Sequence, residues 1–145
     1  MLSTKIFLDL GGGIFMLLGA LHALYTFTDI GKPRRLVPND PAVSVAMANC
    51  QLRLSGEGTT MWRAWVGFNL SHSIGVILLG VLCVGAGHTL ASTAIPAWVL
   101  FVLPLVGLMY LIIGVIYWFR IPSIGVAIAT GFLILAWLTY VVRGI

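Results

Sequence analysis

Charge is what this sequence most lacks. Only 8% of its 145 residues are Asp, Glu, Lys or Arg, whereas 60% are hydrophobic and the mean hydropathy is +1.08. Soluble domains carry about 25% charged residues, so this composition excludes an ordinary soluble domain. Between positions 64 and 119 there is no charged residue at all. We therefore predict an integral membrane protein, with the lipid bilayer as a partner and no nucleic-acid partner.

Long uncharged stretches indicate where the chain crosses the membrane. A spanning helix needs about 20 apolar residues, and the stretch 64–119 is long enough for two, divided at 85–96 where Gly, Ser, Thr and Pro cluster. The apolar runs are unbroken rather than alternating, which favours helices over barrel strands. We predict a single all-α domain, 1–145, in which four transmembrane helices form an antiparallel bundle, with spans at about 6–28, 61–86, 95–119 and 121–142.

Cysteine and acidic residues are also rare, which limits the chemistry that the chain can support. The two cysteines, Cys50 and Cys83, belong to no CxxC motif or Cys/His cluster. Of the four acidic residues, only Asp9 falls inside a predicted span. A zinc or di-iron site needs several such ligands, so we expect no metal site of this kind.

The few cations are distributed unevenly. Four spans place the loop at 29–60 and the turn at 119–122 on one side of the membrane. Six of the eight cations lie in or next to these segments: Lys32, Arg34, Arg35, Arg53, Arg63 and Arg120. Lys5 and Arg143 fall on the other side. Because cytoplasmic loops carry the excess of Lys and Arg, we predict a cytoplasmic 29–60 loop and both termini outside. The membrane is expected to be a bacterial inner membrane.

The loop between the first two spans is predicted to contain a short helix at about 41–54. Asp40 suits the N-cap, Pro41 the first helical position, and Gly56 the position just past the last turn. One face would carry the apolar residues at helical spacing, Val43, Met47, Cys50 and Leu54. We expect this amphipathic helix to lie in the headgroup plane or over the cytoplasmic mouth of the bundle.

Three cations precede that helix in the sequence "KPRR". Lys32, Arg34 and Arg35 follow the first span directly, and each could add about 1 kcal/mol of attraction to anionic lipid. Contact with lipid headgroups is one interpretation. The other is that these residues only set the topology.

Polar residues gather at the centre of the second span, in "FNLSHSIG" at 68–75. At 1.5 Å per residue from Trp62, His72 lies about 15 Å into the membrane. His22 lies about 10 Å in from Asp29, counted from the same edge. Because a polar side chain facing lipid without a partner is costly, we expect these residues to face the bundle interior.

Other spans deliver polar groups to a similar depth, and together they predict a pocket in the cytoplasmic half of the bundle. Its predicted lining residues are His22, Thr26, Asn69, His72, Ser73, Tyr110, Tyr117 and Thr130. Pockets with apolar walls and a few convergent polar groups are typical of small-molecule sites. We expect a small or lipid-like ligand of quinone or isoprenoid type.

Two alternatives remain open at this point. The polar residues of an accessory or scaffold subunit, in a homo-oligomer or a larger membrane complex, would only fix helix packing through interhelical hydrogen bonds. Alternatively, His22 and His72 could ligate one haem iron axially. Hydrolytic catalysis is not expected, because Ser71, His72 and Ser73 point about 100° apart on a helix and no acid is present to orient the base. Whether the chain is an enzyme is left open by its sequence.

Overall fold

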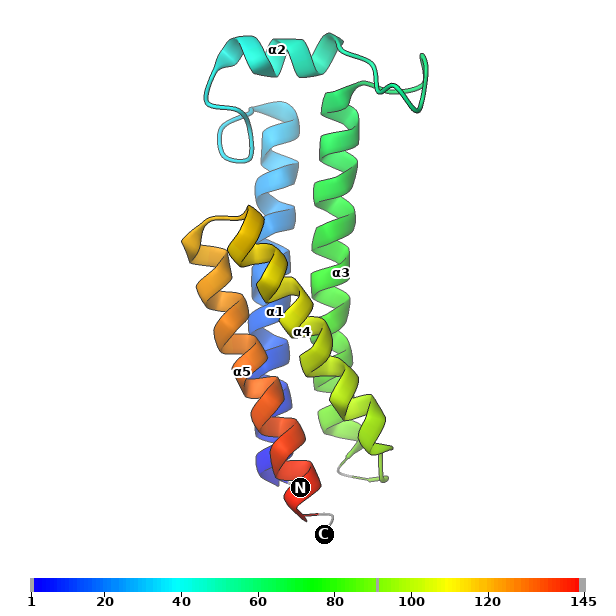
Figure 1. The fold of residues 1–145 in the computed structure, drawn as a ribbon, viewed down its shortest axis with the longest axis vertical. Coiled ribbons are helices and arrows are strands. Elements are labelled where there is room, and N and C mark those ends of the chain that lie inside the picture. The colour runs from blue at the N-terminus through cyan, green and yellow to red at the C-terminus, as the bar shows by residue number, and fades with distance from the viewer. Residues whose placement is uncertain (1, 91, 144–145) are drawn as a thin grey trace. The chain divides into compact units, whose positions relative to one another are not determined.

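The computed structural model describes residues 2–90 and 92–143, and every regular element in these ranges is an α-helix (Figure 1). In chain order the helices are α1 (Leu2–Gly31), α2 (Pro41–Asn49), α3 (Met61–Thr89), α4 (Ala97–Tyr117) and α5 (Arg120–Arg143). Apart from α2, each is long and apolar enough to cross a membrane. The predicted all-helical class, with four candidate membrane spans, is confirmed.

The first helix extends beyond the predicted span at both ends. The added N-terminal residues include Lys5, whose side chain forms an ion pair with that of Asp9 across one helical turn. Such a pair supports the helix locally and lowers the cost of carrying a carboxylate in an apolar segment. At the other end, the amide of Lys32 donates to the carbonyl of Thr28 at 3.0 Å, which closes the last turn.

The start of α2 agrees with the prediction. The Asp40 carboxylate accepts a hydrogen bond from the amide of Ala42 at 2.8 Å, as an N-cap does, and Pro41 occupies the first helical position. Proline is favoured there because its missing N–H would have no partner within the helix.

The predicted end of α2 is wrong. The helix stops at Asn49 because Cys50 is extended, and the chain then pairs Gln51 with Thr60 in an isolated antiparallel bridge. Gly56, with φ of +54°, serves the turn inside that bridge instead of capping the helix. Cys50 and Leu54 therefore lie outside the helix, and no residue of α2 is buried.

The chain divides into two compact units, and α1 and α3 each contribute residues to both. Unit one comprises Met1–Leu18 and Val76–Ile145, and unit two comprises Gly19–Gly75. The apolar core belongs to unit one and contains Leu8, Phe15, Val76, Leu79, Cys83, Leu90, Leu100, Leu103, Ala129, Leu133 and Ala136. α4 and α5 pack against each other in this unit. The turn between them is held by Ser123, whose hydroxyl donates to the carbonyl of Gly114 at 2.9 Å.

Two glycines set the separation of α1 and α3 in unit one. A Cβ built on Gly80 would lie 2.9 Å from the backbone nitrogen of Met16, and a Cβ on Gly12 would lie 2.7 Å from the carbonyl oxygen of Gly80. Two backbones can approach this closely only where both positions lack a side chain. By contrast, a Cβ on Gly13 or Gly85 would meet no atom within 4 Å.

We predict that Gly80→Ala lowers the free energy of unfolding by about 1–3 kcal/mol, because the added methyl group must push two backbones apart. Gly12→Ala should have a similar effect. Thermal unfolding in detergent, followed by circular dichroism, measures it. Gly13→Ala and Gly85→Ala are the matched controls and should leave stability unchanged or slightly raised, since alanine favours a helix. Equal effects at all four positions would contradict the close-packing account.

Candidate functional site

Residues of the predicted pocket are distributed over both units. His22, Thr26, Asn69, His72 and Ser73 belong to unit two, whereas Tyr110, Tyr117 and Thr130 belong to unit one. The unit-two residues come from α1 and α3.

The centre of this group is a hydrogen bond between His22 and Asn69, whose Nε2 and Oδ1 atoms lie 2.8 Å apart. The orientation of the Asn69 amide is fixed by its other end, where Nδ2 donates to the carbonyl of Trp65 at 2.8 Å. Oδ1 must therefore act as the acceptor, so Nε2 of His22 carries the proton. A neutral imidazole in this tautomer presents Nδ1 as an acceptor.

His72 lies beside this pair. Its ring meets the ring of His22 edge to face, with centroids 5.3 Å apart, and the ring of Phe68 stacks on it at 6.3 Å. Both imidazoles are half-buried, while Asn69 is only 3% exposed. The amide is thus enclosed, and the two imidazoles each retain an accessible part.

The hydroxyls of Thr26 and Ser73 are committed to their own helices. Thr26 donates to the carbonyl of His22 at 2.9 Å, and Ser73 donates to the carbonyl of Asn69 at 2.8 Å. Each bond satisfies a buried hydroxyl within its own helix. Neither hydroxyl proton is directed at the imidazoles.

The three remaining predicted residues have different surroundings in unit one. Tyr110 is half-buried, with its ring 6.4 Å from that of Phe15. Thr130 is 1% exposed and packs against Gly107, where an added Cβ would lie 2.7 Å from its hydroxyl oxygen. Tyr117 is 78% exposed. Its expected inward orientation came from helical spacing alone, and spacing does not distinguish the residues at the very end of a helix, where few neighbours are left to cover them.

The imidazole pair does not fit axial ligation of a haem. Two axial histidines need the macrocycle between their rings. Here the two rings are in edge-to-face contact, and Nε2 of His22 is engaged by Asn69. No group of three or more His, Cys, Asp or Glu residues that could hold a metal ion occurs in the described ranges either.

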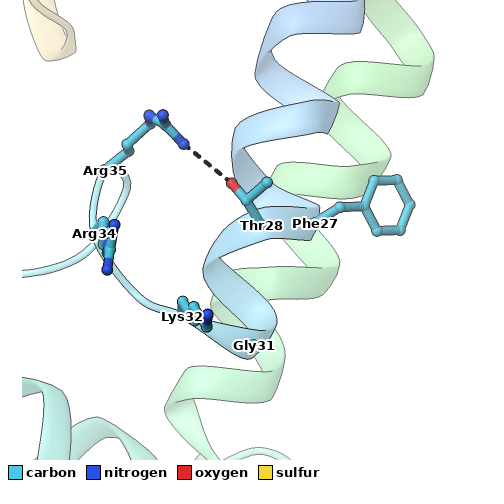
Figure 2. A pocket seen from close by; sticks show the side chains of 6 residues that line it. All are labelled: Phe27, Thr28, Gly31, Lys32, Arg34 and Arg35. Carbon is cyan, nitrogen blue, oxygen red and sulfur yellow. Dashed lines mark hydrogen bonds between the residues drawn. The ribbon is translucent and has the colours of Figure 1, made fainter.

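A second polar feature lies where α1 ends, and its residues include all three cations predicted to contact lipid headgroups. It is an open hollow of about 400 Å³ lined by Phe27, Thr28, Gly31, Lys32, Arg34 and Arg35, which we call the cationic hollow. In Figure 2 the loop that carries the arginines folds back beside the last turns of α1, and the Arg35 guanidinium is directed at Thr28.

Asp29 holds this loop in place, a role that sequence analysis missed. The carboxylate is 3% exposed and accepts hydrogen bonds from the amides of Arg34 at 3.0 Å, Arg35 at 3.1 Å and Leu36 at 2.6 Å. Leu36 is also fixed from α3, because its carbonyl accepts from the indole of Trp65 at 2.9 Å. A signal was present: a carboxylate in the last turn of a helix opposes the helix dipole, so a compensating partner was to be expected.

Comparison of the chain with protein-family models, with curated proteins and with solved structures yields no match.

Replacing Asn69 tests the central hydrogen bond. Asn69→Leu keeps the side-chain size but removes the partner of His22, so we predict a loss of about 1 kcal/mol in stability, since interhelical bonds in membranes average about 0.6 and reach about 1.7 kcal/mol. Thermal unfolding in detergent measures this loss. Ser71→Leu serves as the control, because Ser71 is exposed and bonds only to the carbonyl of Phe68. A loss in the control equal to that of Asn69→Leu would argue against the assigned bond.

Proposed function

We propose that this chain is a small polytopic membrane protein that binds a lipid-like ligand of quinone or isoprenoid type at the His22–Asn69–His72 cluster. The observation that carries the proposal is the pair of half-buried imidazoles in contact beside an enclosed amide, on helices apolar enough to cross a membrane. Histidines within membrane spans are rare and commonly functional.

The chemistry of the cluster suits the head of such a ligand. A quinone ring is flat, apolar on its faces and accepts hydrogen bonds at its carbonyls. The N–H of the His72 imidazole is the matching donor, since the N–H of His22 is engaged by Asn69. The stacked rings of Phe68 and His72 offer a flat aromatic wall. Phe68 is more than half exposed, so an isoprenoid tail would meet an apolar side chain beside His72.

A second candidate function is that of an accessory or scaffold subunit, in a homo-oligomer or a larger membrane complex. The hydroxyls of Thr26 and Ser73 and the amide of Asn69 all bond within the chain, which is how residues that only fix packing behave. The two functions differ in what removal of an imidazole should do.

We predict that His72→Ala abolishes retention of a co-purified lipid or quinone while the protein still inserts and purifies. Native mass spectrometry of the detergent-solubilised protein detects the bound species. Ser71→Ala, one position away and exposed, is the matched control and should keep the ligand. In a scaffold subunit, His72→Ala would instead lower the unfolding temperature, and wild-type protein would carry no such ligand.

The proposed setting is an antiparallel four-helix bundle in a bacterial inner membrane, with the 29–60 loop cytoplasmic, both termini outside and α2 lying in the interface. The bias of Lys and Arg toward that loop supports this orientation. Opposed residue pairs on α1 and α3 within each unit, such as Gly12 with Gly80 and His22 with Asn69, support the antiparallel packing.

The two native cysteines allow the orientation to be tested without introducing further cysteines. Cys50 is exposed and Cys83 is buried, so a membrane-impermeant maleimide should react only with Cys50. We predict labelling in inside-out vesicles and none in intact sphaeroplasts. Cys50→Ser should abolish labelling and Cys83→Ser should leave it unchanged. Labelling of intact sphaeroplasts would reverse the proposed orientation.

A further inference from the structure

We infer that the cationic hollow is a phosphate-binding site, with Lys32, Arg34 and Arg35 as its ligands and Asp29 as the residue that positions them. This site is separate from the imidazole cluster and does not depend on the function proposed above. The chemical class recognised is a phosphate group, carried either by a lipid headgroup or by free inorganic phosphate.

The charge balance at the hollow favours an anion. Three cations line it, and they exceed the single charge of Asp29 together with the roughly half negative charge at a helix C-terminus. The Asp29 carboxylate is also buried and turned toward the loop amides. Its negative charge is therefore largely compensated by the backbone donors it accepts from.

Hydrogen bonds hold the loop in one conformation, so the site differs from a flexible basic segment. Three backbone amides bond to Asp29, and the Trp65 indole bonds to the carbonyl of Leu36. The Arg35 side chain is held as well: its Cζ lies 4.8 Å from the centre of the Tyr25 ring, and Nη1 lies 3.4 Å from the hydroxyl of Thr28. A preorganised loop loses less conformational freedom on binding than a slack one.

Residue type and position point to phosphate in particular. The planar guanidinium fork matches two phosphate oxygens at once, and one bond to Thr28 leaves Arg35 with further donors among its five N–H groups. The hollow lies at the end of a candidate spanning helix, and Phe27, which is 61% exposed, contributes to it. An apolar residue next to three cations suits the boundary between a phosphate headgroup and its acyl chains.

The test measures binding of the purified protein to phosphatidylcholine nanodiscs that contain about 10–20% phosphatidic acid. A separate measurement uses inorganic phosphate. The variants are Arg34→Gln, Asp29→Asn and the control Arg53→Gln, which removes an exposed cation of the same loop that does not line the hollow. We expect Arg34→Gln to weaken binding more than about tenfold and Arg53→Gln less than about twofold. Loose attraction to an anionic surface would weaken both by the same factor, about fivefold for each cation.

Asp29→Asn discriminates best, because net charge and loop geometry predict opposite changes in the strength of anion binding. If only net charge mattered, removing a carboxylate would tighten anion binding. If Asp29 positions the arginines, binding should weaken by about fivefold or more, although no cation has been lost. Tighter binding by Asp29→Asn, or equal losses for Arg34→Gln and Arg53→Gln, would overturn the proposal.

A third variant covers the case in which Asp29→Asn fails to insert. Arg34→Lys keeps the charge but removes the fork, and it should weaken binding by at least about threefold if the guanidinium geometry is used. Wild-type affinity in Arg34→Lys would then overturn the proposal. Binding of inorganic phosphate with the same variant pattern identifies free phosphate as the ligand, whereas binding of phosphatidic acid alone identifies the headgroup. If neither phosphatidic acid nor inorganic phosphate binds more strongly than plain phosphatidylcholine nanodiscs do, the proposal is overturned.

Discussion

The need to satisfy polar groups without water governs how this chain uses its few polar residues. In the candidate spans, the side chains of Thr26, Asn69 and Ser73 each donate to the backbone carbonyl one turn earlier. Such bonds leave the helix exterior apolar at little cost. Two side-chain bonds instead join different helices: Thr4 with Thr139, and His22 with Asn69. The second imidazole and Phe68 are arranged around the bond of His22 with Asn69.

The same constraint explains why helix packing in unit one depends on small residues. Lipid tails are as apolar as the side chains they would replace, so association relies on close contact. Gly12 and Gly80 provide that contact between α1 and α3, and Gly107 provides room for the Thr130 hydroxyl between α4 and α5. Not every glycine has this role, because Gly13 and Gly85 face open space. Position on the helix decides which glycines determine packing.

Asp29 shows how an unfavourable local placement becomes favourable in a larger context. A carboxylate near a helix C-terminus is destabilising by itself, yet here it organises the loop that follows the helix. Its three backbone partners come from residues 34–36, and the same segment carries the two arginines. The negative side chain of Asp29 thus fixes the position of two positively charged residues, and the inferred phosphate site depends on this arrangement.

The sequence by itself determined the class of the protein and the rough limits of its elements. Scarcity of charge and long apolar runs were enough for four spans, and the local chemistry of Asp40 and Pro41 was enough for the start of α2, because these signals act over a few neighbouring residues. Tertiary structure decided the rest. The pairing of Gln51 with Thr60 ended α2 early, and Asp29 met amides that follow it after a turn. The contact of His22 with Asn69 and His72 required two helices to meet in one register. Helical spacing gives the face of each residue on its own helix, but which faces meet, and at what separation, is set by packing between segments far apart in the chain.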